Sequence, residues 1–210
     1  MAFDRRKFRK IPGVTFAKLL GCGTGETFTP SDAALNRWAI LLVVESSEID
    51  SAISSIDSAS LMKKWRKNSE NEYRAVLQNI SSHGKWSSQE PFQPSVSKVQ
   101  SQDRIAAITR ARLRPSRALT FWRSIPPVVD ALSRSKGLLQ SFGIGEAPIG
   151  LQGTFSLWES SEALRAFAYE SAAHKKAIAD TAQLQWYSEE LFARFKVLDE
   201  RGAITARSTS

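Results

Sequence analysis

Gly143-Ile144-Gly145 begins the stretch that decides the fold, because the order of elements around it occurs twice in the chain. An apolar strand follows and ends at Leu157-Trp158-Glu159-Ser160-Ser161, and a helical stretch comes next. The same order begins earlier at Gly21-Cys22-Gly23 and continues through Val43-Val44-Glu45-Ser46-Ser47 into a helical stretch. Self-similarity of this kind indicates a duplicated supersecondary unit. Two such units packed face to face would enclose a central cleft.

The second copy contains a complete ferredoxin-like unit. Residues 105–114 alternate as a strand does, with Arg110, Arg112 and Arg114 on the face opposite the apolar residues. A helical stretch follows at 117–133, where Pro126-Pro127 either divides the helix or opens its second part. Strands at 138–145 and 151–158, a helix capped by Ser160 or Ser161, and a closing strand at about 189–198 complete the order βαββαβ.

The first copy is shorter. It contains two strands, a helix and a strand-like closing segment at 71–77, but only residues 1–12 precede its first strand at 14–20. Those residues are too few for the opening strand and helix. We therefore expect an α+β fold with a shortened half at 1–80, a connecting loop at 81–103, a full half at 104–199 and a flexible tail at 200–210. The loop is long, so Trp86 and Phe92 could line a pocket or simply pack against the body.

Composition and charge narrow the class of protein. An apolar content of 42% with 24% charged residues is ordinary for a soluble globular chain. We expect a cytoplasmic protein, because no apolar run is long enough to span a membrane and residues 1–7 show no apolar signal core. The formal charge of +8 could attract an anionic partner or describe a solvated face, but no nucleic-acid-binding motif accompanies it. Cys22 is the single cysteine, which excludes an internal disulfide and a zinc site built from cysteines.

Three familiar chemistries find no support. The run Gly21-Cys22-Gly23-Thr24-Gly25 lacks the Lys-Ser/Thr ending of a phosphate loop and lies between two strands. Glu146 could act as a general base, but the sequence places no partner beside it. The Gly-x-Ser-x-Gly motif of many serine hydrolases does not occur.

Several motifs, in order along nearly the whole chain, resemble the spheroidene monooxygenase family of carotenoid-oxidising proteins. In the first half they are Lys18-Leu19-Leu20-Gly21-Cys22-Gly23-Thr24-Gly25-Glu26-Thr27-Phe28-Thr29-Pro30, Trp38-Ala39-Ile40-Leu41, Gly84-Lys85-Trp86 and Glu90-Pro91-Phe92. In the second half they are Thr109-Arg110-Ala111, Phe121-Trp122, Gly143-Ile144-Gly145-Glu146, Phe155-Ser156-Leu157-Trp158, Phe167-Ala168, His174, Ala177-Ile178 and Glu189-Glu190-Leu191-Phe192-Ala193-Arg194-Phe195. The resemblance implies a fold like the dimeric α/β barrels, here without the opening strand and helix. It also implies haem and the introduction of oxygen into a long polyene.

Haem needs an axial ligand, an apolar pocket and partners for its propionates. His174 is the candidate iron ligand, because on a continuous helix it shares a face with Phe167 and Ile178. The alternative is a histidine that only packs in the core. His83 lies in the serine-rich loop and is the weaker candidate.

Other side chains could complete a haem site. Arg110 could bind a propionate through its fork of donors, or could lie on an exposed strand face. Phe155, Trp158 and Phe167 could line the cofactor and substrate space, or form plain core.

The first hypothesis is thus a haem-dependent monooxygenase that acts on a hydrophobic, carotenoid-like small molecule with electrons from a separate donor. Two alternatives stay open: a non-catalytic haem- or lipid-binding module, and a cofactor-independent enzyme of the same fold. A homodimer is expected, since ferredoxin-like sheets commonly pack through their faces. The basic N-terminus leaves room for peripheral contact with a membrane.

Overall fold

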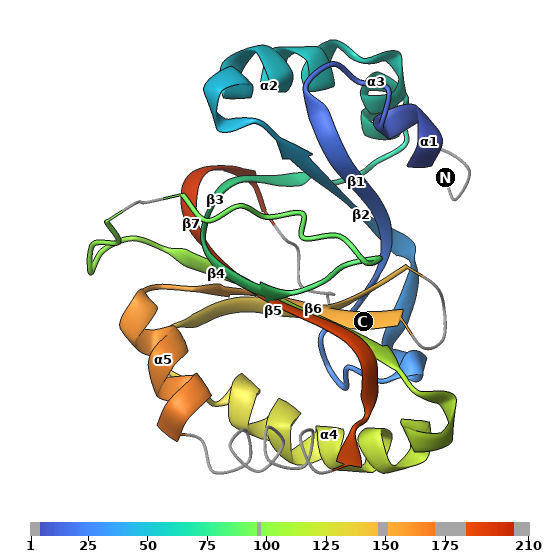
Figure 1. Ribbon diagram of the computed structural model, residues 1–210, viewed down its shortest axis with the longest axis vertical. Helices are drawn as coiled ribbons and strands as arrows, with labels where there is room; N and C mark the ends of the chain where they lie inside the picture. The colour runs from blue at the N-terminus through green and yellow to red at the C-terminus, as the bar shows by residue number, and fades with distance from the viewer. Residues whose placement is uncertain (1–4, 96–97, 147–150, 171–183, 204–210) are drawn as a thin grey trace.

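Both repeats contribute to one curled antiparallel sheet, which runs through the middle of the molecule (Figure 1). The computed structural model describes residues 5–95, 98–146, 151–170 and 184–203. Within them the strand order is β2-β1-β5-β6-β4-β7-β3, and every neighbouring pair is antiparallel. The strands are β1 (Val14–Gly23), β2 (Ala33–Val44), β3 (Tyr73–Gly84), β4 (Ile105–Leu113), β5 (Leu138–Gly145), β6 (Leu151–Trp158) and β7 (Tyr187–Gly202).

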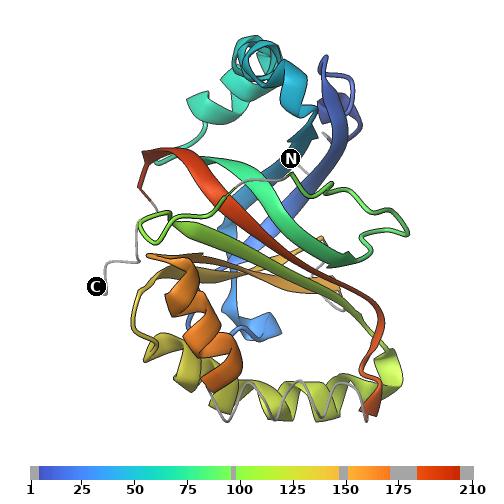
Figure 2. The ribbon, with the colours of Figure 1, turned by 60° about the vertical axis from the view of Figure 1, so that its left-hand side comes forward.

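Two groups of helices pack on the outer face of the curled sheet, one at the top and one at the bottom of the molecule in Figure 1, as Figure 2 also shows. The α-helices are α1 (Arg5–Phe8), α2 (Ile49–Ser58), α3 (Ser60–Lys67), α4 (Ala118–Ser133) and α5 (Ser161–Glu170). Short 3-10 turns are η2 (Pro30–Asp32), η3 (Ser46–Glu48) and η4 (Pro115–Arg117). Trp65 of α3 packs with Phe8 and Ala17 against the outer face of β1, whereas Leu132 of α4 and Leu164 of α5 pack against the outer face of β4 and β6. Among the described residues, no helix is long and apolar enough to cross a membrane.

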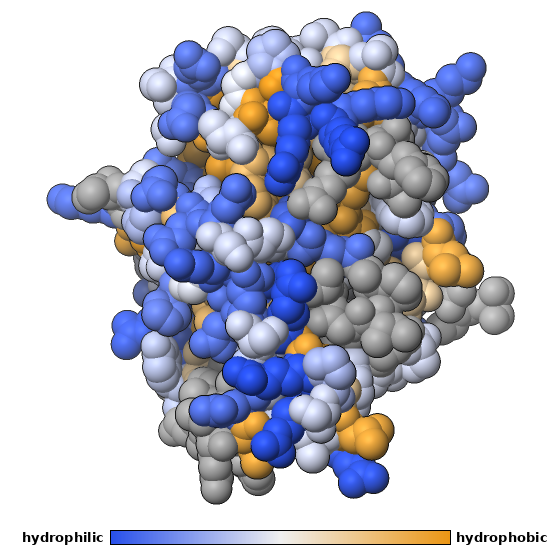
Figure 3. Space-filling model, turned by 45° about the vertical axis from the view of Figure 1, so that its right-hand side comes forward, coloured by the Kyte–Doolittle hydropathy of each residue, from blue (hydrophilic) through white to orange (hydrophobic). Residues whose placement is uncertain are grey.

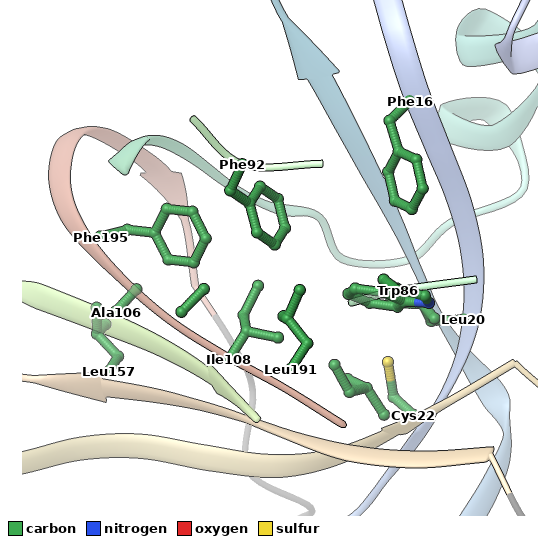
Figure 4. Close-up of a cluster of buried hydrophobic side chains, with 12 residues drawn as sticks. Phe16, Leu20, Cys22, Trp86, Phe92, Ala106, Ile108, Leu157, Leu191 and Phe195 are labelled. Atoms are coloured by element: carbon green, nitrogen blue, oxygen red, sulfur yellow. The ribbon is translucent and has the colours of Figure 1, made fainter. Parts of the chain in front are cut away.

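The inner face of the curled sheet encloses the largest apolar core. Alternate residues of each strand point inward, as the period of two requires. This core contains Phe16, Leu20 and Cys22 of β1, Leu191 and Phe195 of β7, and Trp86 and Phe92 of the connecting loop (Figure 4). We call this enclosed space the interior, and the opposite face of β4 and β6, beneath α4 and α5, the helix side.

The expected α+β, barrel-like fold of duplicated ferredoxin-like units is confirmed. In the second unit the strand order β5-β6-β4-β7 is that of a βαββαβ unit with its first strand in the centre. The two repeats meet through their repeated glycine runs, since Gly21 pairs with Gly145 and Cys22 pairs with Ile144. They meet again where β3 pairs with β7. The motif that revealed the repeat in the sequence thus lies at the junction of the two halves.

Some boundaries differ from the sequence-based expectation. Residues 118–133 form one α-helix, α4, that neither breaks nor restarts at Pro126 and Pro127. Proline has no backbone N–H, so the carbonyl groups one turn before Pro126 and Pro127 receive no helical hydrogen bond. Both prolines are exposed, so water can bind these carbonyl groups instead. β3 continues to Gly84, which shortens the connecting loop, and β7 runs from Tyr187 to Gly202.

Candidate functional site

Phe167 and Trp158 form an aromatic wall on the helix side of the sheet. Their rings stack with centroids 5.4 Å apart and an interplanar angle of 28°. Trp158 is fully buried, and its Nε1 donates a hydrogen bond to Ser156 Oγ at 2.9 Å. Because its one polar atom is satisfied, the indole keeps a fixed orientation, and its apolar ring packs against Phe167. Ile105, Leu132 and Leu164 complete this cluster.

Helix α5 carries Phe167 and begins as the sequence predicts. Ser160 accepts a hydrogen bond from the Ala163 backbone N–H at 3.1 Å through its Oγ, so Ser160 is the capping residue. Leu164 and Phe167 then lie three residues apart and face the sheet together. The helix is described as far as Glu170. His174, the predicted iron ligand, lies outside the described residues.

Four charged side chains form an ion cluster on the interior face, on four different strands or their ends. Lys18 Nζ lies 2.6 Å from Glu146 Oε2, and Arg110 Nη2 lies 3.4 Å from Glu146 Oε1. Arg110 Nη1 also donates to Glu189 Oε1. The two cations are buried almost completely, with side-chain exposures of 0% for Lys18 and 3% for Arg110. Two positive and two negative charges therefore share one largely dry site.

A tight turn covers the ion cluster. Trp86 and Gln89 pair as an isolated bridge, and the two residues between them, Ser87 and Ser88, have φ angles of 55° and 62°. Positive φ at both central residues is the geometry of a type I′ turn. Glu189 accepts hydrogen bonds from the backbone N–H groups of Ser87 and Ser88 at 3.0 and 2.7 Å. The carboxylate thus holds the turn and Arg110 together.

The indole of Trp86 lies within the ion cluster and is fully buried. Its Nε1 donates to Glu146 Oε1 at 2.6 Å. Lys18 Nζ lies 5.6 Å from the ring centroid, and the guanidinium carbon of Arg110 lies 5.8 Å from it. Both distances suit a cation–π contact. Trp86 is therefore the aromatic surface against which the two cations rest.

Burial and hydrogen bonding act in opposite directions on the two carboxyl groups. Burial by itself would raise the pKa of Glu146, but hydrogen bonds from Lys18 and Trp86 outweigh it and lower the pKa below its usual range. For Glu189 the opposing effect of burial is likewise outweighed by the backbone N–H groups and by Arg110, so its pKa is lowered. Both side chains are ionised at neutral pH, which makes them acceptors and not proton donors.

The structure separates the sequence-predicted residues into two groups. Phe155 and Trp158 are three positions apart on β6, so they point to opposite faces. Phe155 stacks on Phe142 at the interior, where Arg110 also lies, whereas Trp158 and Phe167 are on the helix side. Arg110 is buried, so the reading of an exposed strand face does not apply to it. His83 is exposed on β3.

Sequence reasoning missed most of the ion cluster. In the sequence, Trp86 lies in a predicted loop, Glu146 has no visible partner, and Lys18 and Glu189 stand out only as parts of motifs. A signal was present, because Lys18 alternates with Phe16 and Leu20 on an otherwise apolar strand face. A charged residue at such an inward position needs a buried counter-charge.

The glycine-rich run of β1 serves a structural purpose. Asp32 is buried in the loop that follows it and accepts hydrogen bonds from the backbone N–H groups of Gly25 and Phe28 at 3.0 and 3.3 Å. Thr24 donates its hydroxyl to the same carboxylate. These are donors that a phosphate would require, so the loop is already filled by its own anion.

The sheet topology defines the chain as an α+β, barrel-like protein with apolar clusters on both faces of its sheet. Comparison with known proteins identifies its family. The spheroidene monooxygenase of Rhodobacter capsulatus is 32% identical over 205 residues, which cover 97% of this chain and 83% of that protein. The chain belongs to the spheroidene monooxygenase family.

Other comparisons agree in part. The spheroidene monooxygenase of Cereibacter sphaeroides is 34% identical over 203 residues, which cover 96% of this chain but 61% of that longer protein. No family model matches the chain. Among solved structures, a candidate monooxygenase of Fusobacterium nucleatum aligns with 96% of this chain and 85% of its own, with a TM-score of 0.46 and 12% identity. At that level the structural likeness carries no functional argument.

Proposed function

We propose that the chain is a monooxygenase that inserts oxygen into a hydrophobic, carotenoid-like small molecule. Its membership of the spheroidene monooxygenase family, over 97% of its length, carries the proposal. The aromatic wall of Trp158 and Phe167 supports it, because a long apolar substrate binds where water is excluded. A separate electron donor would deliver the reducing equivalents that the reaction consumes.

We further propose haem as the cofactor, with His174 as the iron ligand. The residue types fit the ring of haem, since Trp158, Phe167 and Leu164 are aromatic and aliphatic side chains that pack together beneath α5. His174 follows Phe167 by seven residues in the sequence. Cys22 does not suit the alternative thiolate ligation here, because it lies in the interior cluster, on the other face of the sheet from Trp158 and Phe167.

The helix side of the sheet, and not the interior, is the face on which we expect haem to bind. Haem bound on the helix side would supply the activation of oxygen. Trp158, fixed by Ser156, and Phe167 would orient the ring and would exclude water from the reacting groups. Arg110 and Phe155 lie on the opposite face, so a propionate contact from Arg110 would require a haem in the interior and not against this wall. We therefore propose that a haem with His174 as its iron ligand would bind on the helix side, where Trp158 and Phe167 lie.

The exposed surface leaves room for the partners that this function implies. β2 and β3 each pair on one side only within the described part of the chain, and a strand edge of this kind can receive a second copy. The face shown in Figure 3 is mainly hydrophilic, with small separate apolar areas. Contact with a lipid surface would rest on exposed apolar side chains such as Leu119, which is 73% exposed and lies between Arg117 and Arg123 in the sequence.

The experiment that tests the proposal compares two histidine variants. The chain has two histidines, so His83→Ala is the matched control for His174→Ala. Purified from haem-supplied cells, the unchanged protein and His83→Ala are expected to show a Soret band with about one haem per chain, and His174→Ala to lose or shift it. Oxidation of a linear carotenoid with oxygen and a reductant then tests turnover.

Each negative result has a distinct meaning. A folded protein without haem would refute the cofactor proposal and favour a cofactor-independent enzyme. Haem without oxidation of any polyene would favour the non-catalytic haem-binding module. An unchanged Soret band in His174→Ala would exclude that histidine as the ligand.

A further inference from the structure

Arg110 has one donor that the ion cluster does not use. Its Nη1 and Nη2 contact Glu189 and Glu146, but its Nε–H is buried and has no hydrogen-bond partner within the described part of the chain. A buried donor without an acceptor is unfavourable, and native structures nearly always satisfy such groups. The side chain is 97% buried, since its exposure is 3%, so bulk water does not serve it.

The charge of the site decides which acceptor suits this donor. Lys18 and Arg110 supply two positive charges, and Glu146 and Glu189 supply two negative charges, at separations of 3.4 Å or less. The cluster is therefore neutral as a whole. An added anion would be buried without a counter-charge, whereas an uncharged oxygen would only accept the hydrogen bond.

The side chains around Arg110 indicate the shape of a ligand whose oxygen could accept from its Nε–H. Trp86 lies against Arg110, and Phe16 meets Trp86 edge to face at 6.0 Å. Leu191 and Ile144 belong to the same buried cluster, and Figure 4 shows Trp86, Leu191 and Phe16 directed toward one another from different segments. Aromatic and aliphatic neighbours of this kind favour a flat, apolar molecule.

We propose that the interior face is a second ligand site, in which Arg110 Nε–H donates to an uncharged oxygen of a flat apolar molecule, such as a ketone. This site lies on the opposite face of the sheet from Trp158 and Phe167. It goes beyond the proposed function, because it needs neither haem nor turnover. Glu189 and Glu146 orient the guanidinium, and the turn from Trp86 to Gln89 covers the bound group.

Three aromatic probes of one shape test the proposal. 2-Acetylnaphthalene carries a carbonyl oxygen, 2-isopropenylnaphthalene replaces that oxygen by a CH₂ group, and 2-naphthoate replaces the methyl group by a charged oxygen. Binding to the purified full chain is measured by equilibrium dialysis. We expect the ketone to bind about tenfold more tightly than either of the other two, as one satisfied hydrogen bond provides.

Substitution of Arg110 by lysine assigns the preference to its Nε–H. Arg110→Lys keeps the positive charge beside Glu189 and removes the donor, so the ketone should lose about tenfold in affinity while the hydrocarbon is unaffected. Arg112→Lys, on the exposed part of the same strand, is the matched control and should keep the preference. Circular dichroism checks that both variants fold.

Several results would overturn the proposal. They are equal binding of the three probes, no binding of any probe, tightest binding of the carboxylate, and a preference that survives in Arg110→Lys. If Arg110→Lys does not fold, the probe ranking on the unchanged protein still decides. The indole N–H resonance of Trp86, assigned through Trp86→Phe, should also shift with the ketone and not with the hydrocarbon.

Discussion

Replacement of Lys18 by methionine should destabilise the protein far more than the loss of a surface charge. The Lys18 side chain is 0% exposed, and its Nζ lies 2.6 Å from both Glu146 Oε2 and Ser87 Oγ. Removing one partner of a buried ion pair costs about 3–5 kcal/mol, because the other charge is left without compensation. Glu146 is 12% exposed and keeps Trp86 and Arg110 as donors, so we expect a loss of about 2–3 kcal/mol in the free energy of unfolding.

Urea denaturation of a double-mutant cycle measures this loss and attributes it to the pair. Glu146→Gln in the Lys18→Met background removes the uncompensated charge and keeps an acceptor for Trp86, so it should recover about 1–2 kcal/mol. The control is Arg134→Met, which breaks a pair with Asp130 whose side chains are 77% and 57% exposed and should cost about 0.5 kcal/mol or less. A cost for Lys18→Met no larger than that of the control would refute the reasoning.

Three further predictions concern pH, the turn and the cysteine. Glu146 and Glu189 have folded-state pKa values below the ordinary 4.5, so their stabilising effect is present above pH 4.5 and is lost as the pH falls through the lowered values. The urea midpoint should thus drop on acidification, less steeply in Lys18→Met, and a flat profile would contradict this. Ser88→Gly should raise the unfolding free energy by about 0.5–1 kcal/mol because its φ is 62°, whereas Ser88→Ala should give no gain. Cys22, with a pKa of about 12, should resist a thiol reagent at neutral pH until urea unfolds the chain, and rapid labelling of the native protein would argue against its burial.

The fold could be predicted because the repeat and the period of two are properties of local sequence. Gly21-Cys22-Gly23 and Gly143-Ile144-Gly145 marked the two halves, and the structure pairs these same runs. The same period would also have separated Phe155 from Trp158, which are an odd number of positions apart on one strand. His174 stays a prediction, since it lies outside the described residues.

The ion cluster could not be predicted, because its members come together only through long-range pairing. Lys18 and Glu146 are 128 positions apart and meet because β1 pairs with β5. Glu189 reaches Arg110 because β7 lies beside β4, and it also holds the turn at Ser87 and Ser88. Nothing in the local sequence reports which of several charged residues will face one another across a sheet.

The duplication also explains where the sheet has its edges. In the second unit β4 lies between β6 and β7, and the corresponding position in the first unit would lie between β2 and β3. Within the described part of the chain these two strands are the ends of the sheet order, so the first unit has its edges where the second has its central strand. The consequence appears in burial: Leu41 and Val43 of β2 and Leu77 of β3 face the interior but are only partly buried, whereas Ala106 and Ile108 of β4 are buried fully. A strand placed between β2 and β3 would bury these side chains and pair both edges, so any segment or partner that closes the sheet there should stabilise the first unit more than the second.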